Sequence, residues 1–180
     1  MISLRSLLFV LCAAILVTGC RFYPDRLYFQ GRSAEPGAWP IMFGTIEVNE
    51  TPMSILGHGN VDTSMPPPVE NGSVFLRVPW VEYRTGASWR ADIELPLSLA
   101  ARYQNTVDLE VAVGRNGEIE ISSRPTAGAE PILVLAECAV RTPGSDAGFE
   151  ATIQYHASLE NWETPENMNA PLPPTSCVSE

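Results

Sequence analysis

Lysine is absent from this sequence, and all 11 of its cationic side chains are arginine. They face 21 carboxylates, so the formal net charge at pH 7 is −10. Because contacts with a phosphate backbone require a basic face, we do not expect nucleic acid as a partner. Apolar residues nevertheless make up 45% of the chain, which is enough for the core of a globular domain.

The signatures of the common enzyme classes are missing as well. The sequence contains no G-x-S-x-G, no H-E-x-x-H, no phosphate-binding loop and no G-x-G-x-x-G. Its two histidines are far apart: His58 lies between two glycines, and His156 lies on the polar side of a predicted strand. We interpret both as exposed side chains, because a general base also needs an orienting partner. We therefore expect no catalytic residue, no metal site, no cofactor and no enzymatic activity.

A long apolar run is also missing. The longest one, Leu7–Val17, has 11 residues and cannot cross a bilayer core of roughly 30 Å as a helix. Arg5 precedes it, and Val17-Thr18-Gly19-Cys20 ends it. This pattern resembles a bacterial lipoprotein signal, which implies cleavage before Cys20 and attachment of diacylglycerol and palmitate there. An ordinary secretory signal or a membrane anchor is the alternative.

The residue after Cys20 is Arg rather than Asp, which by the sorting logic of such lipoproteins favours the outer membrane. We therefore predict a signal peptide over residues 1–19 and a lipidated tether over 20–26. Residues 27–180 then form a single β-rich domain, held by its lipid on the periplasmic face of the outer membrane.

Two of the four cysteines remain after these assignments. Cys12 leaves with the signal and Cys20 carries lipid, so Cys138 and Cys177 are left in an oxidising compartment. We expect them to pair; closing a loop of about 40 residues would stabilise the fold by roughly 3 to 4 kcal/mol. Two buried free thiols or a metal pair are the alternatives, although two Cys and two distant His do not give a zinc spacing.

Short apolar runs bounded by Gly, Pro and Asn recur roughly every ten to fifteen residues, a spacing typical of all-β domains. Leu97–Tyr103 suits one short helix, since Pro96 is tolerated in a first turn. The predicted fold is mainly β: an antiparallel sandwich or open barrel of about eight strands with one short helix. The predicted strands cover Leu27–Gln30, Ile41–Val48, Ser73–Arg84, Trp89–Leu95, Thr106–Val113, Glu118–Ser123, Ile132–Arg141 and Phe149–His156.

Some of these segments carry further expectations. Pro79 cannot donate to a ladder, so its strand lies at a sheet edge or bends at a bulge. Ile132–Ala136 is continuously apolar, which suits a strand covered on both faces. The last two predicted strands form a hairpin through residues 142–148. Residues 51–71 and 161–180 are expected to be irregular.

The hairpin over residues 107–121 allows two registers. A two-residue turn at Asn116-Gly117 would place Val113 opposite Glu120 and mix the two faces. A three-residue loop, Arg115–Gly117, with Gly117 in the left-handed region, places Val113 opposite Ile119 and Val111 opposite Ile121. We predict the second register, because it keeps one face apolar.

The outer face of this hairpin then carries Glu110, Glu118 and Glu120, with Asp108 opposite Arg124. A solvated surface is the simpler interpretation, and a docking surface for a basic partner is the more specific one. Most of the large apolar side chains are expected in the core, from a set that comprises Val78, Trp80, Val81, Tyr83, Trp39, Trp89 and Trp162. Trp162 lies in a polar segment and is the first candidate for an exposed interface anchor, with burial under the C-terminal tail as the alternative.

Five segments stand in a recognisable order along the chain: Leu27-Tyr28-Phe29, Trp39-Pro40-Ile41, Pro66-Pro67-Pro68, Trp80-Val81-Glu82-Tyr83 and Trp89-Arg90-Ala91-Asp92-Ile93-Glu94-Leu95-Pro96. Taken together, they resemble a family of proteobacterial lipoproteins catalogued as a domain of unknown function. The resemblance implies a periplasm-facing lipoprotein without known catalysis. Some lipoproteins of this kind look like immunity proteins that neutralise phospholipase effectors delivered between bacteria. It carries over no site residue, and it does not cover residues 51–59 or the tail after Trp162.

Together these observations predict a lipid-anchored binding module with one protein partner, and an immunity protein against a phospholipase-type effector as its most specific form. The alternative is a structural or assembly lipoprotein of the outer membrane. An envelope hydrolase with a cryptic site is a third hypothesis, which would require His58 or His156 beside carboxylates in a pocket.

Overall fold

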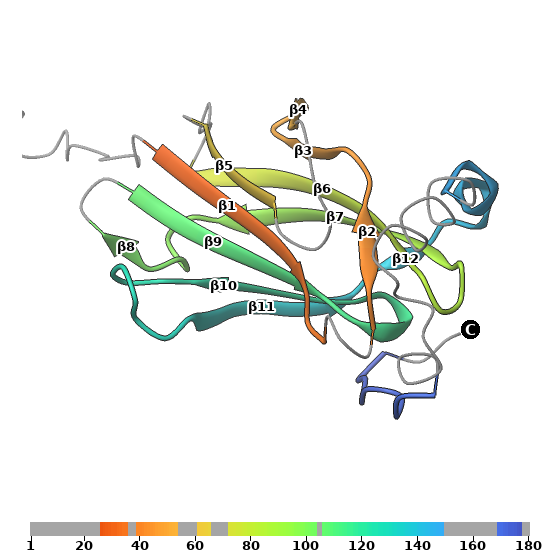
Figure 1. Cartoon of the computed structure of the whole chain (residues 1–180). Coiled ribbons are helices and arrows are strands. Elements are labelled where there is room, and N and C mark those ends of the chain that lie inside the picture. Colours follow the sequence, from red (N-terminus) through yellow and green to blue (C-terminus); the bar gives the residue numbers. More distant parts are fainter. Residues whose placement is uncertain are drawn as a thin grey trace, which may run out of the picture.

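The computed structural model describes residues 26–35, 39–53, 61–65, 72–103, 106–149 and 169–177. These segments form two six-stranded sheets that pack as a sandwich (Figure 1). The first sheet has the order β11-β10-β9-β1-β5, with β8 paired to β9, and the second has the order β12-β7-β6-β3-β4, with β2 paired to β6. The predicted class, mainly β with a sandwich architecture, is confirmed, and the described strands close no barrel.

The first sheet consists of β1 (Arg26–Ser33), β5 (Val61–Met65), β8 (Arg102–Tyr103), β9 (Thr106–Val113), β10 (Glu118–Ser123) and β11 (Ile132–Cys138). The second consists of β2 (Ile41–Phe43), β3 (Ile46–Val48), β4 (Thr51–Met53), β6 (Ser73–Glu82), β7 (Ser88–Pro96) and β12 (Val140–Arg141). The described strands pair antiparallel except for β1 and β9, which are parallel over eight residues. The first sheet is therefore mixed rather than purely antiparallel.

The core lies between the sheets and follows the predicted alternation. In β7, Ala91, Ile93 and Leu95 are buried while the residues between them are exposed. The largest fully buried side chains come from both sheets, including Trp80, Phe29 and Leu109. Each such side chain contributes about 1.5 to 3 kcal/mol when it leaves water. As predicted for most of the large apolar side chains, Trp39, Trp80 and Trp89 are buried.

Pro79 lies in the interior of the second sheet, so its strand is not at an edge. The strand that pairs with it on one side is interrupted instead. Phe43 pairs with Trp80 and Glu47 pairs with Arg77, so the segment from Phe43 to Glu47 has one residue more than the segment of β6 that it faces. The N–H of Gly44 donates to the Pro79 carbonyl at 2.8 Å. The irregularity lies in the partner strand and not in the strand of Pro79, which keeps an unbroken register with β7, and it divides the predicted strand Ile41–Val48 into β2 and β3.

The predicted strand Ile132–Arg141 crosses from one sheet to the other. Its first part, β11, pairs with β10, and its last part, β12, pairs with β7. Between them the N–H of Ala139 donates to the carbonyl of Gly117 at 2.8 Å. The expectation that Ile132–Ala136 is covered on both faces is wrong, because β11 is the last of the described strands in its sheet and Ile132 and Leu133 are exposed.

The predicted helix over Leu97–Tyr103 is also wrong. Leu97 is fully buried, its N–H donates to Gly72, and the N–H of Ala101 donates to Ser123 Oγ rather than to a carbonyl one turn earlier. These long-range bonds hold the segment as a turn that leads into β8. The described part of the chain has its short helical segment elsewhere, at residues 146–149, directly after the 3-10 turn η2 (Pro143–Ser145).

Phe149 therefore does not start a strand as predicted. It packs on the outer face of the second sheet against Met42, Val81 and Tyr83. The rest of the predicted strand, residues 150–156, lies outside the described residues. The stretch 51–71, expected to be irregular, contains β4 and β5. Among the described residues, no helix is long and apolar enough to cross a membrane.

Candidate functional site: an acidic hollow under the C-terminal strap

The β9–β10 hairpin has the register predicted for a three-residue loop. Val113 pairs with Ile119 and Val111 pairs with Ile121. The loop is the 3-10 turn η1 (Arg115–Gly117), in which Gly117 has φ +78° and Asn116 also lies in the left-handed region. The Gly114 N–H donates to the Glu118 carbonyl at 2.7 Å and closes the loop. This register places Glu118 and Glu120 together on the outer face of the first sheet.

A buried carboxylate from the second sheet supports the hairpin loop. Glu82, at the end of β6, is 1% exposed; its Oε1 accepts from the Gly117 N–H at 3.4 Å and its Oε2 accepts from Thr85 Oγ1 at 2.7 Å. Burial raises the pKa of Glu82 above its ordinary value of 4.5, and the hydrogen bonds from Thr85 and the loop amides oppose that rise. The tip of the hairpin is thus attached to the opposite sheet.

Residues 169–177, called here the C-terminal strap, run across the same loop. The disulfide between Cys138 and Cys177 that the sequence predicts is present, which overturns the alternatives of free thiols and a metal pair. Side chains of the hairpin add hydrogen bonds: Arg115 donates to the Pro173 carbonyl and Asn116 to the Cys177 carbonyl. The strap therefore has a fixed position on the hairpin.

Trp39 lies at the centre of this attachment. Its ring is flanked by the guanidinium carbons of Arg84 and Arg115, at 5.3 and 5.9 Å from the ring centroid. Arg84 also donates to the Ala170 carbonyl of the strap at 3.2 Å. The Trp39 ring thus contacts two arginines, and both of them donate hydrogen bonds to carbonyl groups of the strap.

A surface hollow of about 450 Å³ lies between the strap and the outer face of the first sheet. Its acidic members are Glu35, Glu118 and Glu120, and none of the described residues that line it is basic. Glu118 Oε1 accepts from the N–H and the Oγ of Ser176, at 3.0 and 2.7 Å, while Glu35 and Glu120 are exposed. The full lining, called here the acidic hollow, is Ala34, Glu35, Ala112, Gly114, Glu118, Glu120, Pro174, Thr175 and Ser176.

The structure brings together two of the four residues predicted to bind a partner. Glu118 and Glu120 line the acidic hollow, whereas Trp162 lies outside the described residues. Glu35 was missed by sequence reasoning, because its position depends on the parallel pairing of β1 with β9 and on the bond from the Ala34 N–H to the Val113 carbonyl. No local pattern in the sequence indicates that pairing.

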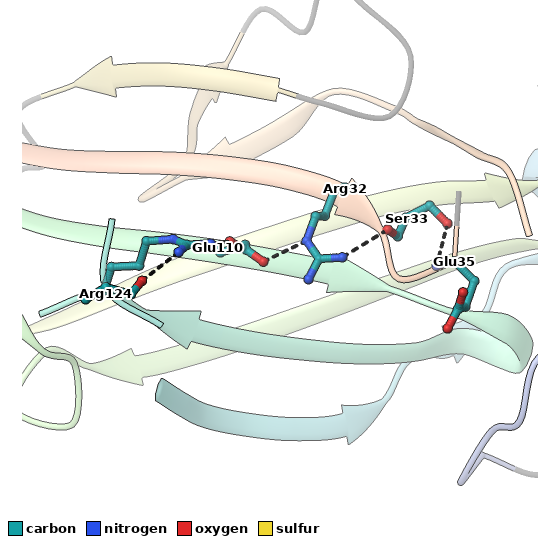
Figure 2. Close-up of polar contacts among 6 residues, drawn as sticks. Arg32, Ser33, Glu35, Glu110 and Arg124 are labelled. Atoms are coloured by element: carbon teal, nitrogen blue, oxygen red, sulfur yellow. Dashed lines mark hydrogen bonds and ion pairs between the residues drawn. The ribbon is translucent and has the colours of Figure 1, made fainter. Parts of the chain in front are cut away.

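Glu110, the fourth predicted residue, is not part of an exposed acidic face. It is 5% exposed and is bonded on both sides, by Arg32 at 2.6 Å and by Arg124 at 2.5 Å (Figure 2). Burial alone would raise the pKa of Glu110, but the bonds from Arg124 and Arg32 outweigh it and hold the pKa below the usual 4.5. The expectation of an exposed docking carboxylate at Glu110 is therefore wrong.

Figure 2 shows that the three charged groups form a row across the outer face of the first sheet, and that Arg32 continues to Ser33 and Glu35. Arg32 Nη1 donates to the Ser33 carbonyl, and the Glu35 N–H donates to Ser33 Oγ. With two arginines and one glutamate the row has a net charge of +1, and it lies beside the acidic hollow, whose own negative charge comes from Glu35, Glu118 and Glu120.

The acidic hollow can accept hydrogen bonds from a cation, because carboxylate oxygens are acceptors only and a guanidinium or ammonium group supplies several donors. Within the described ranges, no three His, Cys, Asp or Glu side chains are arranged to hold a metal ion. Comparisons with protein-family models, with curated proteins and with solved structures give no match to this chain.

Proposed function

We propose that this protein is a lipid-anchored periplasmic binding module whose acidic hollow receives a basic side chain of one protein partner. The observation that carries the proposal is the hollow itself, where Glu35 and Glu120 present exposed carboxylates under a strap fixed by a disulfide. A site held on sheet strands and a fixed strap loses little conformational freedom when it binds.

The charge of the chain supports a basic partner. A net charge of −10 attracts cationic surfaces over a distance of about one Debye length, roughly 8 to 10 Å at physiological salt. Such attraction raises the association rate more than the final affinity, and salt weakens it. Tethering through Cys20 would further raise the effective concentration of the module at the membrane where a partner arrives.

The most specific form of the proposal is an immunity protein that neutralises a phospholipase-type effector. It draws on the family resemblance of segments such as Trp80-Val81-Glu82-Tyr83, together with the anchor that the signal implies. A protein that blocks an enzyme needs a rigid complementary surface and no catalytic group, and the acidic hollow fits that requirement.

The test is a pull-down in which the tagged mature chain, carrying Cys20→Ser, is the bait. Envelope extract and a panel of secreted bacterial lipases supply the candidate partners, at low and at high salt. We expect one lipase to bind at low salt and to lose its activity. Capture of resident envelope proteins alone would instead favour the structural or assembly role, and failure to bind any envelope protein or lipase at any ionic strength would overturn the proposal.

A pair of charge variants locates the contact. Glu35→Gln combined with Glu120→Gln removes two carboxylates from the hollow and should weaken capture by about tenfold. Glu94→Gln combined with Glu130→Gln removes the same charge from exposed positions outside the hollow and serves as the matched control. Equal losses in the two double variants would show that net charge, rather than the hollow, attracts the partner.

A further inference from the structure

Exposed apolar side chains gather at one end of the sandwich. The described residues include seven large hydrophobic side chains that are exposed, and four of them lie at this end. The four, called here the apolar collar, are Leu99 (62% exposed), Leu133 (57%), Ile132 (53%) and Tyr103 (49%). None of them carries a charge.

Hydrogen bonds and strand register place the segments that carry the collar next to one another. Ile132 pairs with Ser123, whose Oγ accepts from the N–H of Ala101, between Leu99 and Tyr103 in sequence. Tyr103 in turn pairs with Thr106, the first residue of β9. Three segments therefore form the collar: the turn after β7, β8 and the start of β11. They meet at one end of the sandwich, so the collar does not follow a single strand.

The chain enters the domain at this same end. Arg26, the first residue of β1, pairs with Thr106, so Arg26, Thr106 and Tyr103 lie side by side in three neighbouring strands. Figure 1 shows the starts of β1 and β9, β8 and the β10–β11 loop together at one end, and the loop after β9 at the opposite end. Five residues lie between Cys20 and Arg26, and the six steps from one to the other span at most about 20 Å at full extension.

We propose that the apolar collar rests on the surface of the lipid bilayer and orients the domain upright. The inference builds on the proposed lipidation at Cys20, which would hold this end of the sandwich close to the headgroups. Leu99, Ile132 and Leu133 would bury their side chains at the headgroup boundary, and Tyr103 has the amphipathic ring that favours this depth. A bilayer can contact all three segments of the collar at once, whereas an added β-strand would cover β11 alone.

The orientation has a consequence for the acidic hollow. β9 runs for eight residues from the collar to the hairpin loop, which separates the two ends by roughly 26 Å at 3.3 Å per residue. With the collar on the bilayer, Glu35, Glu118 and Glu120 would be presented away from the membrane and its anionic lipids. A soluble basic partner could then reach the hollow from the periplasm.

A fluorescent reporter at Leu99 tests the collar in the complete lipidated protein. Because Cys12 is removed with the signal, Cys20 is acylated and Cys138 is bonded to Cys177, Leu99→Cys would supply the one reactive thiol for the dye NBD. The labelled protein is reconstituted into vesicles of phosphatidylethanolamine and phosphatidylglycerol. We expect the emission of the dye to shift to the blue on the vesicles. We also expect spin-labelled lipids in the bilayer to quench this emission.

The control is Leu172→Cys, labelled in the same way. Leu172 is 53% exposed, like the collar residues, but it lies in the C-terminal strap near the hairpin loop, so its dye should keep the spectrum of a water-exposed probe. A dye at Leu99 that is as exposed and as weakly quenched as the dye at Leu172 would overturn the proposal.

Failure of the anchor is measured separately. The mass of the purified protein shows directly whether Cys20 carries diacylglycerol. If it does not, the mature chain with Cys20→Ser and an N-terminal histidine tag is bound to the same vesicles through nickel-chelating lipids, and the reporter at Leu99 is read again. Quenching in that arm supports the collar even though the proposed lipidation has failed, and its absence rejects the collar.

Discussion

Gly117, at the tip of the β9–β10 hairpin of the first sheet, lies directly against the indole of Trp89 in the second sheet. A Cβ at Gly117 would stand 2.5 Å from Cε3 of Trp89, closer than side-chain carbons approach one another. The backbone of Gly117 is also left-handed, at φ +78°, and its N–H donates to the buried Glu82. One glycine therefore closes the hairpin and sets how closely the two sheets meet at this end.

Gly117→Ala should destabilise the protein by about 2 to 5 kcal/mol, since the left-handed backbone costs about 1 to 2 kcal/mol and overpacking adds about 1 to 3 kcal/mol. Urea unfolding of the two proteins measures the difference. Gly128→Ala is the matched control, because Gly128 has φ +77° but no atom lies within 4 Å of its Cβ position. Equal losses for the two variants would rule out the contact with Trp89 as a constraint.

Glu82 gives the fold a pH dependence of known sign. Its folded pKa is raised above 4.5, so the folded state binds its proton more tightly than the unfolded state does. This carboxyl therefore adds stability as the pH falls from above the folded pKa to 4.5, and that stability is lost again as the pH rises. Glu82→Gln removes the titrating group while keeping an acceptor for Gly117.

The expected result for Glu82→Gln concerns the difference in unfolding free energy between variant and parent. On acidification from pH 8 to pH 4.5 the parent should gain stability relative to the variant, as measured by urea unfolding at each pH. The other titrating groups cancel in this difference. A difference that stays constant, or that changes in the opposite direction, would show that Glu82 is not desolvated in the folded protein.

The sequence predicts the mainly β class, with a sandwich or an open barrel as its two forms, because alternation is a local signal. Ala91, Ile93 and Leu95 alternate with charged residues, and the Asn116-Gly117 loop allows only one register that keeps the hairpin apolar on one face. The same local reasoning failed at Leu97–Tyr103, where a helical composition is overridden by long-range bonds to Gly72 and Ser123. It failed at Ile132–Ala136 because apolar composition does not distinguish a covered strand from an exposed edge.

The acidic hollow was predictable only in part. Glu118 and Glu120 could be placed on one strand face from the hairpin pattern, and the bridge from Cys138 to Cys177 could be inferred from the cysteine count. Glu35 could not be found, since parallel pairing of β1 with β9 joins segments about 80 residues apart. Glu110 was misjudged because its arginine partners, Arg32 and Arg124, come from two other segments.

The disulfide should contribute most of the attachment of the C-terminal strap. Cys138→Ser with Cys177→Ser opens a loop with a sequence separation of 39 and should lower the unfolding free energy by about 3 to 4 kcal/mol in the chain-entropy account. Hydrogen exchange should also quicken at residues 115–118 of the hairpin and at residues 175–177 of the strap, which are bonded to each other. Unchanged exchange there would mean that Arg84, Arg115 and Asn116 hold the strap without the covalent bond.

The row Arg32–Glu110–Arg124 should act on stability in the sense opposite to Glu82. Two arginine bonds hold the pKa of Glu110 below 4.5, so its contribution is present above that value and is lost as the pH falls through the folded pKa. Glu110→Gln should cost about 1 kcal/mol at pH 7, because Arg32 and Arg124 are partly solvated and the pairs are screened accordingly. The cost should shrink on acidification below pH 4.5, as measured by urea unfolding at each pH.

The control is Glu94→Gln at an exposed position, which should leave the unfolding free energy nearly unchanged at both pH values. If Glu110→Gln costs no more than Glu94→Gln, then the row of Arg32, Glu110 and Arg124 does not contribute to stability.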